Sequence, residues 1–257
     1  MLKVRVIPTL LWKDLGLVKG VGFDSWRRVG SVLPAVKVYN TRDVDELILV
    51  DITASRMQAA PDHESVSDFS DACSVPMTVG GGIVDLDQIT RLLMAGADKV
   101  SINSSAFSSP DLIDRGARRF GSQCIVLSVD ARRHPDGTYE CFSHAGTRPT
   151  GRDPVAWARE GRDRGAGEIL LTSVERDGTM EGYDLRLVEA VARAVDVPVI
   201  ASGGAGSYQH MVEVVRDAGA SAVAAASIFH FTELTPAGAR SALRHAGIPV
   251  RMDFVTT

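Results

Sequence analysis

Short apolar runs alternate with amphipathic segments along the whole chain. Each run is followed by a small or polar residue, as a buried strand of a parallel sheet commonly is. The runs that predict strands are Val4–Pro8, Leu47–Val50, Pro76–Val79, Lys99–Ile102, Ile125–Val129, Ile169–Thr172, Pro198–Ala201 and Ala222–Ala225. Eight strands that alternate with helices predict an α/β fold of the closed (βα)8 barrel type.

The segments between these runs carry apolar residues at helical spacing, and several have clear ends. Asp153-Pro154 and Thr235-Pro236 each place a capping side chain before a proline in the first helical turn. The predicted helices include Leu86–Ala95, Pro110–Phe120, Pro154–Gly165, Leu185–Val195, Tyr208–Ala218 and Pro236–Ala246.

Two connections are too long to be simple turns. The segment Lys13–Gly30 is polar and glycine-bearing, which predicts a long loop that acts as an active-site lid. The segment Arg132–Gly151 contains the turn signal Pro135-Asp136-Gly137 ahead of the run Tyr139–Ser143, which predicts a small hairpin. The two connections follow the first and the fifth strand.

The second half of the chain repeats the first at a shift of about 122 residues. Val75–Gly82 reappears as Val197–Gly204, with the proline and the glycine pair at the same offsets. The repeat predicts one domain over residues 1–257, made of half-barrels at about 1–122 and 123–245. In each half, glycines after one strand let backbone N–H groups approach an anion, and a serine after the next strand adds a hydroxyl.

The chemistry of such a barrel lies at the carboxyl ends of its strands. Two matched glycine turns there predict a phosphorylated small molecule as the ligand. Lys19 could clamp a phosphate or be a solvated lysine, and Asp177 could bind substrate or only form a turn. The predicted substrate and phosphate residues are Lys19, Gly81, Gly82, Asn103, Ser104, Thr172, Asp177, Gly203, Gly204, Ala226 and Ser227.

Asp130 ends the apolar run of the fifth strand. A charge at that place is costly unless it opens into a site, so Asp130 is predicted to be a catalytic carboxylate rather than a helix cap or a loop anchor. At the opposite end of the barrel, four charged residues enter strands and should converge in a ring: Arg5, Glu46, Lys99 and Glu168. Spacing alone leaves open whether this ring is a salt-bridged plug or a gate.

Composition narrows the function classes. The net charge of −4 over 257 residues gives no basic footprint for nucleic acid, and no apolar run is long enough to cross a membrane. The start of the chain lacks a signal peptide, so a cytoplasmic location is expected. The three cysteines are widely spaced, which indicates neither disulfides nor a zinc site, and no metal or other cofactor is expected.

Several motifs resemble one family, the cyclase subunit of imidazole glycerol phosphate synthase from histidine biosynthesis. They are Val18–Val21, Asp45–Leu47, Asp51–Ser55, Thr78–Ile83, Ala95–Ser104, Phe120–Val126, Gly165–Ser173, Ile200–Gly206 and Ala226–His230. The resemblance implies a barrel whose amino-side face binds a glutaminase subunit as a heterodimer. Ammonia then passes through the four-residue ring as a gate and along the barrel axis, and the residue matching Asp98 lies at the glutaminase interface.

The resemblance also implies a reaction. Related proteins split a phosphoribulosyl-formimino carboxamide ribonucleotide and close an imidazole ring with the incoming nitrogen, using aspartates on strands one and five as general acid and base. Asp130 matches the second aspartate, whereas Leu11 stands at the position of the first. A leucine cannot transfer a proton. Losing such a group commonly costs about 10²–10⁴-fold in rate.

Three hypotheses follow. The favoured one resembles a paralogous branch encoded with surface-polysaccharide genes, in which the barrel supplies ammonia to a separate amidotransferase that makes an acetamidino sugar. The alternative is a histidine-pathway cyclase in which another group replaces the missing acid. The third, the sugar-isomerase sister barrel of the same pathway, is disfavoured because it also relies on an acid at the first strand and because Lys99–Ser104 is cyclase-like.

Overall fold

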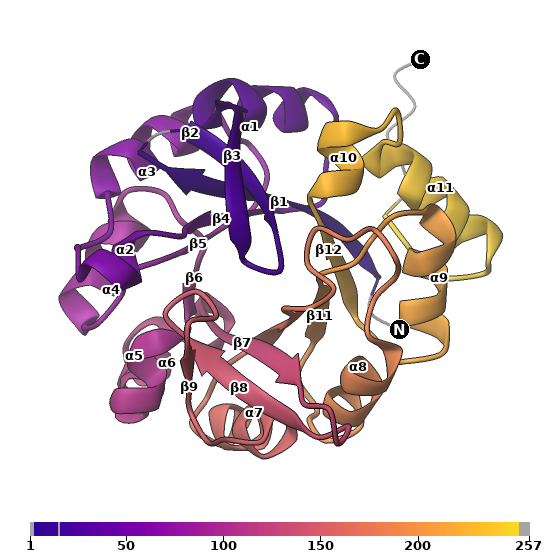
Figure 1. Ribbon diagram of the computed structural model, residues 1–257. Helices are drawn as coiled ribbons and strands as arrows, with labels where there is room; N and C mark the ends of the chain where they lie inside the picture. The colour runs from indigo at the N-terminus through magenta and orange to yellow at the C-terminus, as the bar shows by residue number, and fades with distance from the viewer. Residues whose placement is uncertain (1–2, 15, 252–257) are drawn as a thin grey trace.

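The strands close into a barrel ringed by helices, as the computed structural model shows for residues 3–14 and 16–251 (Figure 1). Each barrel strand pairs in parallel with a neighbour on either side, and β1 closes the circle by pairing with both β12 and β4. The barrel strands are β1 (Arg5–Lys13), β4 (Leu47–Asp51), β5 (Met77–Gly80), β6 (Lys99–Ile102), β7 (Ile125–Arg133), β10 (Glu168–Ser173), β11 (Val199–Ser202) and β12 (Ala222–Ala225). The predicted (βα)8 barrel is confirmed.

Each predicted apolar run overlaps one barrel strand to within a residue at its start, but two strands continue well past the predicted ends. β1 and β7 each run on into an antiparallel hairpin, in which Leu11 pairs with Val18 and Asp130 pairs with Phe142. The second hairpin, formed by β7 and β8 (Tyr139–Ser143) with the short β9 (Arg148–Pro149), confirms the prediction for Arg132–Gly151.

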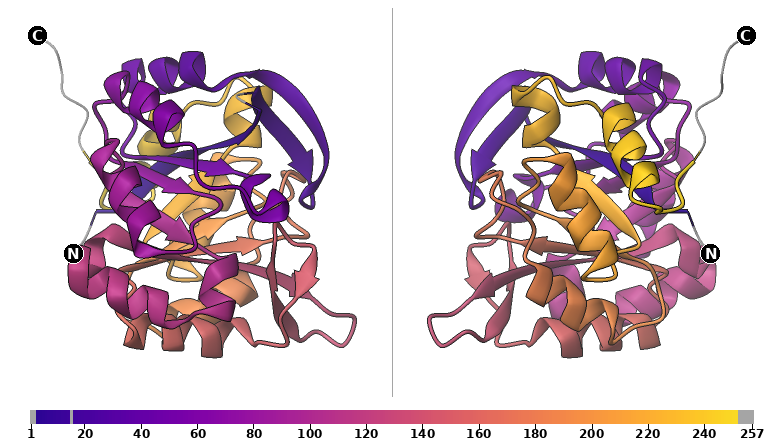
Figure 2. Two further views of the ribbon diagram at one scale, coloured as in Figure 1. Left: turned by 90° about the vertical axis from the view of Figure 1, so that its left-hand side faces the viewer. Right: turned by 90° about the vertical axis from the view of Figure 1, so that its right-hand side faces the viewer.

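The expectation of a loop over Lys13–Gly30 is wrong. Apart from residue 15, which lies outside the described residues, the segment forms β2 (Gly16–Val21) and β3 (Asp24–Ser31), an antiparallel pair that curves over the carboxyl ends of the barrel strands (Figure 2). Six of the eight residues of β3 are exposed, so the strand lacks the buried apolar face by which a strand is recognised. Backbone pairing with β2 holds it instead.

The helices pack around the outside of the strands. The predicted caps are present: the Asp153 carboxylate accepts from the backbone N–H of Ala156 at 2.8 Å, and the Thr235 hydroxyl from that of Gly238 at 3.1 Å. Among the described residues, no helix is both long and apolar enough to cross a membrane. The helices are α1 (Val32–Thr41), α2 (Ala54–Met57), α3 (His63–Asp71), α4 (Leu86–Met94), α5 (Ser104–Ser108), α6 (Asp111–Phe120), α7 (Pro154–Asp163), α8 (Leu185–Ala192), α9 (Tyr208–Arg216), α10 (Ser227–Phe231) and α11 (Pro236–His245).

The core has two shells because residues on a barrel strand alternate between its two faces. The outer shell lies between strands and helices, where Leu47, Leu49 and Val100 are fully buried. The inner layer fills the barrel axis with Ile7, Ile48, Val126, Leu170, Ile200, Ala222 and Ala224. This layer separates the two ends of the barrel, and polar residues occupy the interior on either side of it.

Candidate active site

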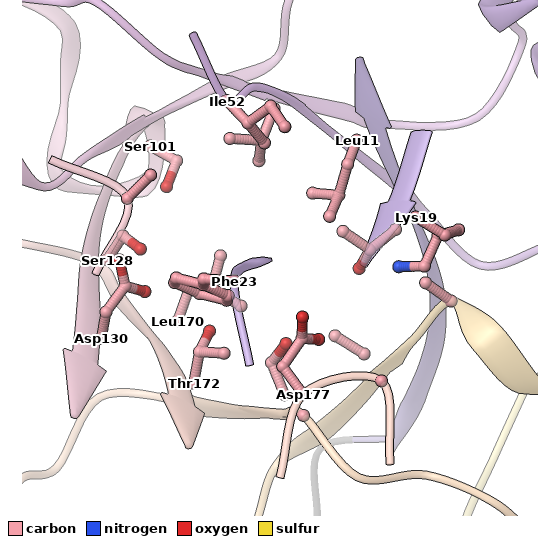
Figure 3. A pocket seen from close by; sticks show the side chains of 18 of the residues that line it. Leu11, Lys19, Phe23, Ile52, Ser101, Ser128, Asp130, Leu170, Thr172 and Asp177 are labelled. Atoms are coloured by element: carbon pink, nitrogen blue, oxygen red, sulfur yellow. The ribbon is translucent and has the colours of Figure 1, made fainter. Parts of the chain in front are cut away.

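A cavity of about 130 Å³ opens at the carboxyl ends of the barrel strands (Figure 3), and residues of the β2–β3 hairpin line it as well. Every one of the eight barrel strands, or the turn that follows it, contributes to its lining. Most predicted substrate and phosphate residues line it, from turns far apart in the sequence: Lys19, Gly81, Asn103, Ser104, Thr172, Asp177, Gly203, Gly204, Ala226 and Ser227. Gly82 lies instead in an adjoining cavity of about 470 Å³, which Ser104 also lines.

Asp130 points into the cavity from β7 and is 8% exposed. Burial, with the nearby charge of Asp177, raises the pKa of its carboxyl from 3.8 to about 7. The side-chain amide of Asn103 donates to Asp130 Oδ2 at 3.2 Å and also to the carbonyl of Ser128 at 3.1 Å, which fixes the orientation of the carboxyl group. A carboxyl group that titrates near neutral pH can both accept and donate a proton.

Lys19 and Asp177 are two more buried titratable residues in the cavity, and their charges interact. Lys19 is 2% exposed, so the interpretation as a solvated lysine is wrong. Burial lowers the pKa of Lys19 and raises that of Asp177, while the attraction between the two charges opposes both shifts. The β2–β3 hairpin carries Lys19, and it is bonded to the turn after β10 that carries Asp177: the N–H of Gly22 donates to the carbonyl of Asp177 at 2.9 Å.

Leu11 lies on the side of the cavity that faces Asp130 and Thr172 (Figure 3). It packs in an apolar cluster with Val18 and Ile52, against which Trp26 and Val50 also lie. Leu11 is therefore part of an apolar wall built from β1, β2, β3 and β4. It is not an isolated apolar residue in a polar site.

The two glycine turns have the same backbone character. Gly81 and Gly203 have φ values of +111° and +89°, a region that side chains with a Cβ rarely adopt. A Cβ atom on Gly81 would lie 2.8 Å from the Cβ of Asp51, and one on Gly203 would lie 2.6 Å from the carbonyl oxygen of Ser173. Both turns thus need glycine, and both present backbone toward the cavity mouth.

Asp51, which also ends a strand, has a different role. Its Oδ1 accepts from the N–H and the hydroxyl of Thr53, at 2.8 and 2.7 Å, and from the N–H of Ala54 at 3.1 Å. These bonds hold the start of α2, so the Asp51 carboxylate orders the turn after β4.

The four charges at the amino end of the barrel do converge in a ring. Arg5 and Lys99 alternate with Glu46 and Glu168, so each cation contacts both carboxylates, at nitrogen–oxygen distances of 2.6–3.1 Å. Glu46 is 1% exposed and accepts an additional bond from the Thr78 hydroxyl at 2.8 Å. Every charge in the ring is paired, so the ring closes the barrel axis below the apolar inner layer.

Asp98 is exposed where β6 begins. Its carboxylate accepts from the N–H of Met77 at 2.8 Å, while its own N–H donates to the Met77 carbonyl at 2.9 Å. Asp98 thus orders the start of β5 and β6, and its expected contact with a second subunit stays a prediction.

Sequence reasoning missed several cavity residues, among them Thr9, Ser101 and Ser128. Each stands two residues before a strand-end residue that the sequence did indicate, namely Leu11, Asn103 and Asp130. Residues two apart on a strand share a face. That spacing is the signal that could have found them. Within the described part of the chain, no three His, Cys, Asp or Glu side chains gather as metal ligands would.

Known proteins with similar sequences identify the family. A family model described as "Histidine biosynthesis protein" matches residues 5–235. A protein of Caulobacter vibrioides is 48% identical over 254 residues, covering 98% of both chains. One from Gluconacetobacter diazotrophicus is 49% identical over 251 residues, covering 98% of this chain and 97% of its own. Both carry the name "Imidazole glycerol phosphate synthase subunit HisF".

These relatives are subunits of an enzyme, and neither name refers to surface polysaccharide. The expected assignment to the polysaccharide branch thus has no support here, and the relatives favour the alternative of a histidine-pathway cyclase. The identity extends over nearly the whole chain, and the fold is the (βα)8 barrel that the resemblance implied. The chain therefore belongs to the histidine biosynthesis protein family, as a member of the HisF group of imidazole glycerol phosphate synthase cyclase subunits.

Proposed function

We propose that this protein is the cyclase subunit of an imidazole glycerol phosphate synthase and closes the imidazole ring in histidine biosynthesis. The observation that carries the proposal is the placement of Asp130 between two matched glycine turns in one cavity, with a carboxyl pKa of about 7. The substrate of this reaction carries a phosphate at each end. Two turns with backbone free to approach an anion, on opposite sides of a proton-transfer group, match that chemistry.

The nitrogen source is ammonia delivered along the barrel axis. The ring of Arg5, Glu46, Lys99 and Glu168 would act as the gate, and the inner layer beyond it is aliphatic. Neutral ammonia can cross an aliphatic layer, whereas ammonium would have to lose its hydration there. The layer thus favours the form of the nitrogen that acts as a nucleophile.

The partner in this proposal is a glutaminase subunit on the amino-side face, where Asp98 is exposed. The relatives are named as subunits, which supports a complex rather than a lone enzyme. An enzyme of phosphorylated metabolites with such a partner is expected in the cytoplasm.

A second candidate rests on Leu11. An apolar wall where related proteins hold an acid favours a barrel that passes ammonia to an acceptor on another protein, such as a sugar amidotransferase. In that case the cavity would bind a phosphorylated ligand without closing an imidazole ring.

The test is ammonia-dependent turnover of the phosphoribulosyl-formimino substrate by the purified protein, at saturating ammonium and alkaline pH. We expect turnover that the Asp130→Asn variant lowers by about 10²-fold or more. The Leu11→Asp variant is measured beside it. A folded protein that is silent, and that gains turnover only as Leu11→Asp, would replace the proposal with the second candidate.

A further inference from the structure

The proposed reaction needs two proton-transfer groups, and β1 supplies none because Leu11 occupies its position. Among the described residues, the carboxylates that line the cavity are Asp51, Asp130 and Asp177. Asp51 is committed to the start of α2, where one of its oxygens accepts three hydrogen bonds. Besides Asp130, that leaves Asp177 as the carboxylate able to serve the cavity.

Asp177 is held rigidly by its backbone. Its N–H donates to the carbonyls of Ser173 and Val174, at 3.0 and 3.2 Å, and its own carbonyl accepts from Gly22 of the β2–β3 hairpin. The side chain points into the cavity from the turn after β10 (Figure 3). Its Oδ2 is buried and has no hydrogen-bond partner among the described residues. A buried carboxylate oxygen without a partner is costly, and a substrate group would supply the missing bond.

The two remaining carboxylates influence one another. The charge of Asp177 disfavours ionisation of Asp130, and burial disfavours ionisation of both. Where one of two carboxyl groups in a site is ionised while the other keeps its proton, the first can act as a base and the second as an acid. Lys19, beside Asp177, limits the cost of keeping a negative charge there.

We propose that Asp177 is the second catalytic residue of this site, providing from the turn after β10 the proton transfer that an aspartate on the first strand provides in related proteins. This inference rests on the proposed function. As ammonia adds to the substrate, the Asp177 carboxylate accepts a proton from its nitrogen. As the carbon–nitrogen bond to the leaving group breaks, protonated Asp130 gives its proton to the departing nitrogen. One proton enters the pair and one leaves, so the charge of the pair is unchanged.

The experiment measures kcat, KM and the pH dependence of kcat with ammonium as the nitrogen source, using the full chain. The variants are Asp177→Asn, Leu11→Asp and the double variant. Asp217→Asn, which makes the same exchange at an exposed residue paired with Arg216, is the matched control. We expect Asp177→Asn to lower kcat by about 10²–10⁴-fold with little change in KM, and to remove one limb of the pH profile.

Rescue separates catalysis from a merely structural role. If the two positions supply the same proton transfer, an aspartate at position 11 should raise the kcat of Asp177→Asn by at least about tenfold. A double variant no faster than Asp177→Asn would overturn the inference. An Asp177→Asn variant with a raised KM and an unchanged kcat would also overturn it, because a residue that only binds substrate would give that result.

Two further outcomes are distinguishable. If the unmodified protein shows no ammonia-dependent turnover, the proposed function is overturned, and this inference with it.

If Asp177→Asn fails to fold, Asp177→Glu keeps the negative charge beside Lys19 and displaces the carboxyl by one methylene. A lower kcat at unchanged KM in that variant supports the inference, and an unchanged kcat overturns it.

Discussion

The raised pKa of Asp130 gives a prediction about stability that is independent of the substrate. The carboxyl titrates near 7 in the folded protein and near 3.8 in the unfolded chain. At roughly 1.36 kcal/mol for each pH unit between the two values, ionising Asp130 costs the folded state about 4 kcal/mol. Asparagine has the same shape, can accept the same bond from Asn103 and never ionises.

The sign follows from proton binding. Below pH 4 the carboxyl group is protonated in both states, and Asp130→Asn should have nearly the stability of the unmodified protein. Between pH 4 and 7 the unfolded chain releases the proton while the folded protein keeps it, so the unmodified protein loses stability as the pH rises. Above pH 7 the Asp130→Asn variant should be the more stable by about 4 kcal/mol.

The assay is urea unfolding followed by circular dichroism at steps from pH 4 to pH 9, with the free energy taken from the midpoint and the slope. Titrating groups that do not interact with Asp130 cancel in the difference between variant and unmodified protein. Asp217→Asn is the control, because the bond from Arg216 lowers the pKa of Asp217 and reverses the sign of the pH dependence. A difference for Asp130→Asn that stays flat with pH, or that favours the unmodified protein at pH 8, would refute the reasoning.

Three other changes test the barrel and the turns. Glu46→Ala leaves the half-buried cations Arg5 and Lys99 with Glu168 as their one remaining ring carboxylate and should lower the free energy of unfolding by about 3 kcal/mol; a loss below about 1 kcal/mol would contradict a tightly paired ring. Gly203→Ala places a Cβ against the carbonyl of Ser173 and should raise the KM for the phosphorylated substrate, so an unchanged KM would argue against a phosphate role for that turn. Asp153→Ala removes the cap of α7 and should cost about 1 kcal/mol in thermal unfolding, which an unchanged midpoint would exclude.

The strands of the barrel could be predicted because each is a buried apolar run with a polar or small residue at its end. The β2–β3 hairpin could not, since β3 exposes most of its side chains and its order depends on backbone pairing with β2 and on the bond from Gly22 to Asp177. A pattern of apolar positions reports burial, and this strand buries little.

By itself the sequence determined the barrel, the strand-end position of Asp130, the two glycine turns and the convergence of four charges at one end. These follow from periodicity, because parallel strands of a closed sheet bring their ends together whatever lies between them. Only the tertiary structure decided that Lys19 is buried beside Asp177, that Leu11 belongs to an apolar wall and that Asp51 serves a loop. Those facts depend on which side chains meet across strands distant in the chain, and on how much water the hairpin excludes from them.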